Sequence, residues 1–195
     1  MSSTQKLLPI KELKEGIVIL KNGEWRTVLM ASSVNFALLS PDEQEAIIYQ
    51  YQNFFNSLDF NIQILVQSRK LNLSGYLKML EATEEKQESE LLRMQASEYR
   101  EFIKSLSEMT NLMSKNFYVT IPFYPLMLGK KALSEEDFAR YKTQILQRIE
   151  YVIAGLRRVG VHSIQLGNEE IIELLWSFYN LSETEKGEIP AFPQV

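Results

Sequence analysis

The dipeptide Asn22-Gly23 stands between two short apolar runs, Ile17–Leu20 and Trp25–Ala31, which are rich in β-branched, leucine and aromatic residues. Asn-Gly is the strongest short signal for a two-residue turn, because both residues tolerate positive φ angles. The two runs therefore predict a β-hairpin near the start of the fold. Residues 33–39 either continue its second strand or form a third.

A sharply defined helix start follows the hairpin. Ser40 can cap the helix, Pro41 suits its first position, and Glu43 completes a capping box. Apolar residues then recur every three or four positions, which predicts one helical face packed on the sheet. They are Ile47, Ile48, Tyr51, Phe54, Phe55 and Leu58. After this helix Phe60, Ile62, Ile64 and Val66 alternate with polar residues and predict a half-buried strand.

The segment Ser74–Met113 has the composition of a long helix. Its centre, Glu81–Glu90, carries five Glu and one Lys and has almost no apolar face. This stretch either projects into solvent as helix or separates two helices. Because it contains neither Gly nor Pro, we expect a continuous or slightly bent helix.

The remaining chain alternates strands and helices. Phe117–Phe123 predicts a strand that ends at Pro122–Pro125, and Ser134 begins a helix that ends at Gly160. The buried stripe of that helix is Phe138, Tyr141, Ile145, Ile149, Val152, Ile153 and Leu156. Val161–Leu166 predicts a short strand, and Asn168 is expected to cap a last helix.

This order of elements predicts an α+β fold. We expect a mixed, largely antiparallel sheet opened by a β-hairpin, with helices packed on it and one long charged helix. Residues 9–181 are expected to form a single domain. Residues 1–8 are expected to be a flexible lead, and residues 182–195 an acidic, proline-containing tail.

Composition excludes several chemistries. The chain has no Cys and a single histidine, His162, which excludes thiol catalysis, zinc–cysteine sites and iron–sulfur clusters. We expect His162 to be a partly exposed strand residue. A net charge of −4 disfavours a general nucleic-acid binder. The string Gly129–Ser134 lacks the first glycine of a phosphate-binding loop. We therefore predict no catalytic residue, no cofactor and no metal.

The chain also lacks the signals of a membrane-inserted protein. The N-terminus has no apolar core of a signal peptide, and the longest uncharged run, Thr27–Pro41, contains several polar residues. A spanning helix needs roughly 20 mostly apolar residues. We therefore expect a soluble protein, with peripheral membrane contact left open.

Two segments are candidates for partner binding. After Pro122 and Pro125 the chain leaves the sheet, so Leu126, Met127 and Leu128 are candidates for an exposed apolar loop that meets a protein or membrane surface. The alternative is that this loop folds back over the edge of the core.

The second candidate is a basic set that includes Lys130 and Lys131. Its other members are Arg140, Lys142, Arg148, Arg157 and Arg158, and with four acidic residues the segment 130–158 has a net charge of +3. This set could face an acidic partner or anionic lipid. The alternative is a solvated helix face.

A family resemblance extends over roughly Thr4–Pro125. It rests on Thr4-Gln5, Leu8-Pro9-Ile10, Gly16-Ile17-Val18, Asn35-Phe36, Glu43-Gln44, Phe54, Leu58, Ser68-Arg69, Tyr76, Tyr99, Phe102, Phe117-Tyr118-Val119 and Pro122. In this combination the chain resembles the TraC-like N-terminal domain of conjugative-transfer, or type IV secretion, ATPases. The chain has no P-loop motor, so ATP binding is not carried over from the resemblance. The chain is then either a stand-alone relative or part of a longer protein.

The resemblance implies a cellular location. Such proteins assemble at the cytoplasmic side of a membrane channel that moves DNA or protein between cells. We therefore expect a non-enzymatic assembly or docking domain that binds protein components of a secretion complex, in the cytoplasm, with no direct nucleic-acid contact. Peripheral contact with the inner face of the membrane and formation of a homo-oligomer are both left open.

Two other classes of function remain. One is a small soluble enzyme that uses carboxylates at the sheet edge, near Ser68-Arg69 and Pro122. The other is a regulatory module that binds a ligand on a similar fold. A cleft lined by converging polar groups would favour these classes, whereas a flat apolar surface around Leu126–Leu128 would favour docking.

Overall fold

The computed structural model describes residues 8–70, 73–87, 89–109, 113–126 and 134–180. The chain divides into two compact units. The sheet unit comprises residues 1–66 and 116–172, and the helical unit comprises residues 67–115 and 173–195. Apart from Leu8, the predicted flexible lead and the predicted tail lie outside the described residues. The single domain over residues 9–181 stays a prediction.

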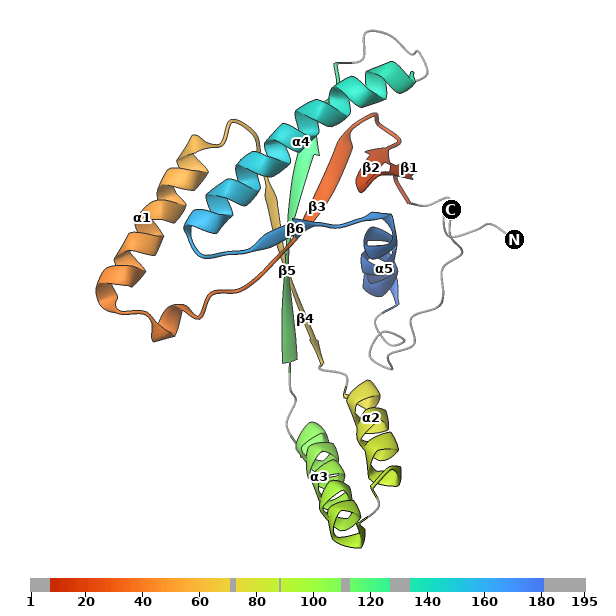
Figure 1. Cartoon of the computed structure of the whole chain (residues 1–195). Helices are drawn as coiled ribbons and strands as arrows, with labels where there is room; N and C mark the ends of the chain where they lie inside the picture. The colour runs from red at the N-terminus through yellow and green to blue at the C-terminus, as the bar shows by residue number, and fades with distance from the viewer. Residues whose placement is uncertain (1–7, 71–72, 88, 110–112, 127–133, 181–195) are drawn as a thin grey trace. The chain divides into compact units, whose positions relative to one another are not determined.

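The strands form one antiparallel sheet, and the helices make the fold α+β, as predicted (Figure 1). The strand order is β1-β2-β3-β5-β4, and β6 pairs with β3. The strands are β1 (Ile10–Lys14), β2 (Ile17–Leu20), β3 (Trp25–Ala31), β4 (Gln63–Lys70), β5 (Met113–Phe123) and β6 (Ser163–Gln165). Both β2 and β6 pair with β3: β2 pairs with residues 25–27 of β3, and β6 pairs with residues 29–31.

The predicted hairpin is confirmed as β2 and β3. Gly23 has a φ of 87°, and its N–H donates to the carbonyl of Leu20 at 3.0 Å. The predicted extension of the strand over residues 33–39 is wrong. Beyond Ala31 the Ser32 N–H donates to the carbonyl of His162, and the chain then forms a short 3₁₀ helix, η2 (Phe36–Leu38).

Strand β1 was not predicted. The turn that joins it to β2 explains why the predicted helix cap at Asn168 is also wrong. Glu15 and Gly16 both have positive φ, and a side chain at Gly16 would come within 2.7 Å of the Leu166 carbonyl. The Asn168 side chain accepts a hydrogen bond from the Gly16 N–H at 2.7 Å. Asn168 therefore fixes the β1–β2 turn and does not cap the last helix, α5 (Asn168–Tyr179).

The other two predicted helix starts, at Ser40 and Ser134, are confirmed. In α1 (Pro41–Ser57) the Glu43 N–H donates to Ser40 Oγ, and the Ser40 N–H donates to the Glu43 carboxylate. In α4 (Glu135–Arg158) the Asp137 N–H donates to Ser134 Oγ at 3.1 Å. The predicted stripe of α4 is buried, except that Ile153 is partly buried.

The core of the sheet unit lies between α4 and the central strands. One cluster joins Leu29 of β3 and Ile121 of β5 to α4, and a second surrounds the fully buried Trp25. Helices α1 and α4 lie side by side (Figure 1), and Gly155 of α4 allows their close approach. A Cβ atom at Gly155 would lie only 2.1 Å from the ring of Phe54 in α1.

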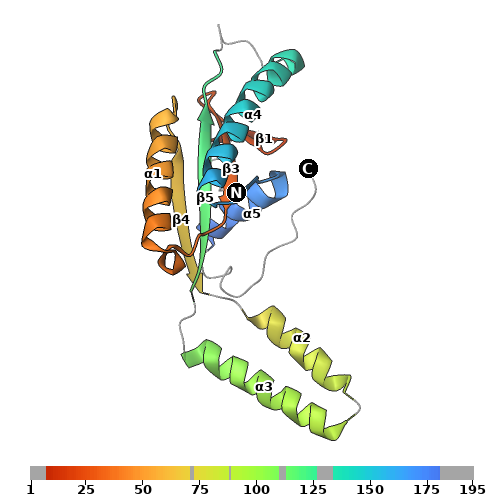
Figure 2. The ribbon, with the colours of Figure 1, turned by 60° about the vertical axis from the view of Figure 1, so that its left-hand side comes forward.

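The charged segment of the helical unit is a hairpin of two helices, α2 (Ser74–Glu85) and α3 (Glu90–Met109) (Figure 2). The predicted continuous helix is therefore wrong. The break needs neither Gly nor Pro, because folding back brings Glu84 to Arg100 at 3.1 Å and Tyr76 to Tyr99 at 3.2 Å. The side chain of Arg93 also donates to the Gln87 carbonyl at 3.0 Å.

Candidate functional site

Helix α1 carries more apolar surface than the core of the sheet unit covers. Phe54 is buried, and Ile47, Tyr51 and Leu58 pack against the core. Ile48 and Phe55, predicted to share this buried face, are 49% and 41% exposed. At about 100° per residue these two lie on the far flank of the stripe, which is wider than one packed face.

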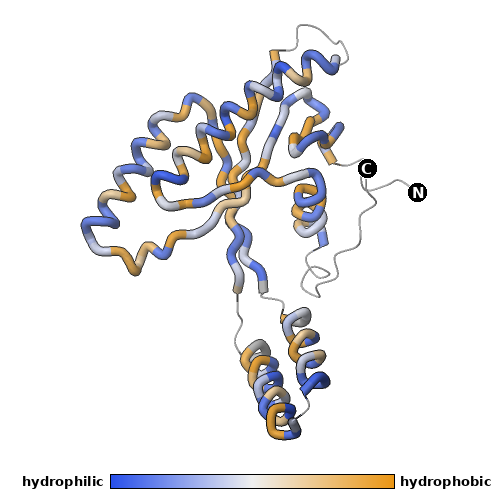
Figure 3. Tube along the Cα trace, in the orientation of Figure 1, coloured by the Kyte–Doolittle hydropathy of each residue, from blue (hydrophilic) through white to orange (hydrophobic). Residues whose placement is uncertain are grey.

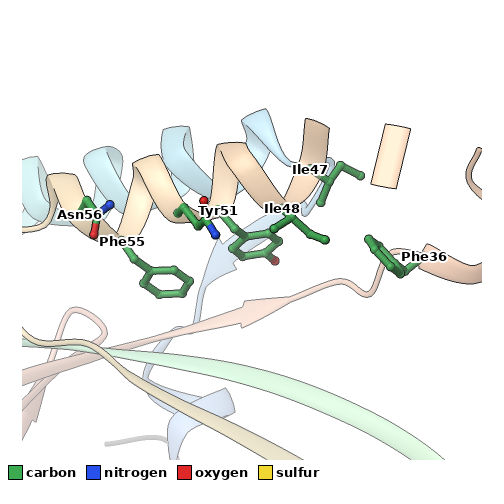
Figure 4. A pocket seen from close by; sticks show the side chains of 7 residues that line it. Phe36, Ile47, Ile48, Tyr51, Phe55 and Asn56 are labelled. Carbon is green, nitrogen blue, oxygen red and sulfur yellow. The ribbon is translucent and has the colours of Figure 1, made fainter. Parts of the chain in front are cut away.

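The exposed flank of α1 borders a groove of about 590 Å³ (Figure 4). The groove is lined by Phe36, Ile47, Ile48, Tyr51, Gln52, Phe55 and Asn56. Tyr51 and Phe55 stack with their ring centroids 5.8 Å apart, which holds both rings along the groove. Burial raises the pKa of the Tyr51 hydroxyl above its usual value.

Strand β4 adds a second exposed apolar element. Ile64, Leu65 and Val66 are between 41% and 53% exposed. Of the residues predicted to form a half-buried face, Phe60 and Ile62 pack against the core, but the prediction is wrong for Ile64 and Val66. The physical reason is position: β4 stands at one end of the strand order with β5 as its neighbour, and no strand in the described part of the chain follows it. Such an edge offers backbone N–H and C=O groups for pairing.

A smaller cavity connects the helix to the strand. It measures about 290 Å³, and its lining includes Ile64 of β4 together with Phe36, Ile47 and Tyr51 of the groove. We call the combined surface the α1–β4 face and define it as Phe36, Ile48, Tyr51, Phe55, Ile64 and Val66. All six residues lie in the sheet unit.

The chemistry of the α1–β4 face suits packing rather than catalysis. Its six side chains carry no charge, and the polar neighbours in the groove are the amides Gln52 and Asn56. Among the described residues no group of three His, Asp or Glu side chains could hold a metal ion. An apolar surface with a free strand edge can accept a peptide segment or a protein surface.

The sequence matches the family model of the archaeal TraC-like domain over residues 11–181. The chain belongs to the archaeal TraC-like family. The match confirms the resemblance seen in the sequence and extends it beyond Pro125. It indicates a domain related to conjugation or secretion. No curated protein matches this chain.

The loop predicted to bind a partner is only partly described in this TraC-like domain. Leu126 is 86% exposed, which corresponds to the first of the two alternatives for this loop, and its carbonyl accepts a hydrogen bond from the Tyr141 hydroxyl at 2.8 Å. Met127, Leu128, Lys130 and Lys131 lie outside the described residues.

The basic residues of α4 have individual contacts in the TraC-like fold. Arg140 pairs with Asp137 at 2.9 Å, and Lys142 pairs with Glu15. The Lys142 ammonium lowers the pKa of the Glu15 carboxyl through this hydrogen bond. Arg148 donates to the carbonyl of Pro122 at 2.7 Å and lies over the ring of Phe60. Three members of the predicted basic set are thus held by the sheet unit itself.

The residues named for an enzyme lie on strands, Ser68 and Arg69 on β4 and Pro122 on β5. Pro122 is buried within β5. His162 was expected to be a partly exposed strand residue; it is exposed, but it lies just before β6 and not in the strand. Two side-chain nitrogens of Arg69, Nε and Nη2, are buried without a hydrogen-bond partner among the described residues. In the same part of the chain no helix has the length and apolar character needed to cross a membrane.

The α1–β4 face was missed because sequence periodicity shows that residues are apolar, not which of them the fold covers. The usable signal was the width of the α1 stripe, in which Ile48 and Phe55 extend beyond a single packed face. For β4 the signal was weaker, because strand order decides which strand becomes an edge.

Proposed function

We propose that this TraC-like domain is a non-enzymatic assembly domain of a conjugation-type, or type IV, secretion system, and that it works at the cytoplasmic face of the membrane. The observation that carries the proposal is the family match over residues 11–181. In this proposal the partner is a protein component of the secretion complex, and peripheral contact with the inner face of the membrane accompanies that assembly.

The α1–β4 face supports docking as the activity. It combines a groove lined by Ile48 and Phe55 with a strand edge that exposes Ile64 and Val66. An extended segment of a partner can pair with such an edge while its alternate side chains enter the neighbouring groove. We therefore assign the partner contact to this face, and we keep the exposed loop at Leu126 as a second candidate surface.

The test compares two exposed residues of α1. Ile48 is 49% exposed and borders the groove, whereas Tyr49 is 64% exposed and does not line it. We expect Ile48→Asp to abolish co-purification of a secretion-complex component from the native host, and Tyr49→Asp to retain it. Both variants should keep the melting temperature of the wild type within a few degrees, because neither side chain is buried.

A photo-crosslinker at residue 64 provides an independent readout. It should trap a protein of the secretion complex, identified by mass spectrometry. Equal capture by the Ile48→Asp and Tyr49→Asp variants would remove the α1–β4 face from the proposal. The Leu126→Asp variant tests the second surface in the same assay. Crosslinks only to unrelated metabolic proteins would contradict the assembly role itself.

A further inference from the structure

The helical hairpin has an apolar side that its own two helices leave uncovered. Six residues form it, and each is between 37% and 57% exposed: Tyr76, Met79, Leu92, Tyr99, Phe102 and Leu106. The hydroxyls of Tyr76 and Tyr99 lie 3.2 Å apart, so these two residues lie on the same side of the hairpin. Met79 on α2 and Leu92, Phe102 and Leu106 on α3 stand three or seven positions from them, which places them on that side too. We call this surface the hairpin face. Hydrophobic positions recur along α3 in Figure 3.

The two helices differ in length, and the difference exposes part of α3. Helix α2 has 12 residues and α3 has 20. Tyr76 stands in the first turn of α2 and meets Tyr99 in the middle of α3. The second half of α3, with Phe102 and Leu106, therefore extends past the start of α2. It lacks a neighbouring helix within the hairpin.

A second copy in antiparallel orientation supplies that neighbour. Leu92 and Leu106 stand seven residues before and after Tyr99, which places the three on one side of α3. When two α3 helices cross at Tyr99 in opposite directions, Leu92 of each copy faces Leu106 of the other. The shorter α2 of each copy then lies beside the overhanging half of the other α3, and the four helices close into a bundle.

Size and charge agree with this arrangement. At 1.5 Å rise per residue and a helix width of about 10 Å, the hairpin presents roughly 500 Å² per copy, which reaches the ~1,000 Å² total of a specific interface. Residues 81–93, at the tip, hold five Glu against Lys86 and Arg93, a net charge of −3. The rest of the two helices, residues 74–80 and 94–109, holds three basic and three acidic residues, a net charge of 0. Antiparallel copies place each acidic tip beside the neutral part of the other hairpin, whereas parallel copies would bring the two acidic tips together.

We propose that two copies of the chain associate through the hairpin face as an antiparallel, two-fold symmetric four-helix bundle. This contact is separate from the α1–β4 face and does not depend on the proposed secretion partner. It gives the protein a self-association surface in addition to a docking surface.

The first experiment measures the oligomeric state by sedimentation velocity over a wide range of protein concentration. Phe102 and Met94 form a matched pair on α3, 57% and 56% exposed, but Met94 is turned about 120° from the centre of the hairpin face. We expect the wild type and Met94→Asp to dimerise, and Phe102→Asp to weaken the dimer about tenfold or more. Circular dichroism should show equal helix content in all three.

The second experiment determines the orientation. The chain has no cysteine, so single cysteines report contacts without background. A mixture of Leu92→Cys and Leu106→Cys proteins should form a disulfide-linked heterodimer under mild oxidation, and Tyr99→Cys should link to itself. Leu92→Cys alone should link poorly.

Three outcomes would overturn the proposal. The first is a wild type that stays monomeric at every concentration, and the second is equal weakening by Phe102→Asp and Met94→Asp. The third is efficient linking of Leu92→Cys to itself, which would mean a parallel arrangement. A wild-type dimer that Ile48→Asp leaves intact would separate this contact from the secretion-partner contact.

Discussion

The sheet unit and the α2–α3 hairpin stabilise themselves in different ways. The sheet unit contains fully buried residues from strands and helix alike, including Trp25, Leu29, Ile121 and Ile145. In the hairpin no residue whose side chain the structure describes is buried, and its contacts are exposed or half-buried polar pairs and the apolar hairpin face. The difference teaches that the sheet unit is held by a buried core, whereas the hairpin is held by contacts at its surface, such as the pair of Glu84 and Arg100.

The largest expected difference between the two regions is in the free energy of unfolding that each loses when one aromatic residue is truncated. Trp25 is fully buried against Phe123, Phe138 and Tyr141, so Trp25→Ala should lower the free energy of unfolding by about 3–5 kcal/mol. Phe102→Ala in the hairpin should cost less than about 0.5 kcal/mol at low protein concentration, because its side chain is already exposed. Urea denaturation measures both. Similar losses would contradict the comparison.

Alanine substitutions at two glycines, one in each region, should change the stability by less, but in opposite directions. An added methyl group at Gly155 meets the Phe54 ring and must displace α1, so Gly155→Ala should destabilise the sheet unit by about 1–3 kcal/mol. At Gly75 in α2 no atom lies within 4 Å of the added group, so Gly75→Ala should be neutral or stabilise the hairpin by up to ~1 kcal/mol. Thermal unfolding followed by circular dichroism distinguishes the two. Destabilisation by Gly75→Ala would mean that the hairpin is packed more tightly than its exposure indicates.

The sequence correctly predicted the features that depend only on neighbouring residues. The Asn22-Gly23 turn and the Ser40 and Ser134 caps depend on residues within a few positions of each other, and all three are confirmed. The break between α2 and α3 was missed, because its cause is a set of contacts such as Glu84 with Arg100 that form only after the chain folds back. Periodicity gives no access to such contacts.

The candidate site was predicted less well for the same reason. Exposure of Ile48 and Ile64 depends on where α4 and β5 lie, and both are far along the chain from these residues. Asn168 likewise has the sequence of a cap, but its side chain binds Gly16, 152 positions away. Residue type predicted that these side chains would pack or accept a hydrogen bond, and only the tertiary structure decides which partner each one meets.

A capping residue tests whether local signals also matter energetically in the well-packed unit. Ser40→Ala removes the Oγ acceptor of the Glu43 N–H and should lower the free energy of unfolding by about 1 kcal/mol. The same hydroxyl and the Ser40 N–H lower the pKa of the Glu43 carboxyl. Stability from Glu43 is therefore present above its unfolded pKa and is lost as pH falls through the folded value. The difference between wild type and Ser40→Ala, measured by denaturation at several pH values, should shrink in acid.

The smallest effect compares one tyrosine from each region. The pKa of Tyr76 in the hairpin is raised above its usual value mainly by the hydrogen bond to Tyr99, whereas the pKa of Tyr51 is raised by burial in the sheet unit. In both, the neutral form stabilises the fold. That stability is present below the unfolded pKa near 10 and is lost as pH rises through the folded value.

The substitution Tyr99→Phe separates these two causes. It removes the hydroxyl partner of Tyr76 without touching α1, so the ultraviolet titration of Tyr76 should move to lower pH while that of Tyr51 stays in place. Difference spectra against Tyr76→Phe and Tyr51→Phe identify the two transitions. A shift of both transitions would mean that the tyrosines respond to a common environment, and the contrast between a region with its own core and a hairpin held by surface contacts would fail at this position.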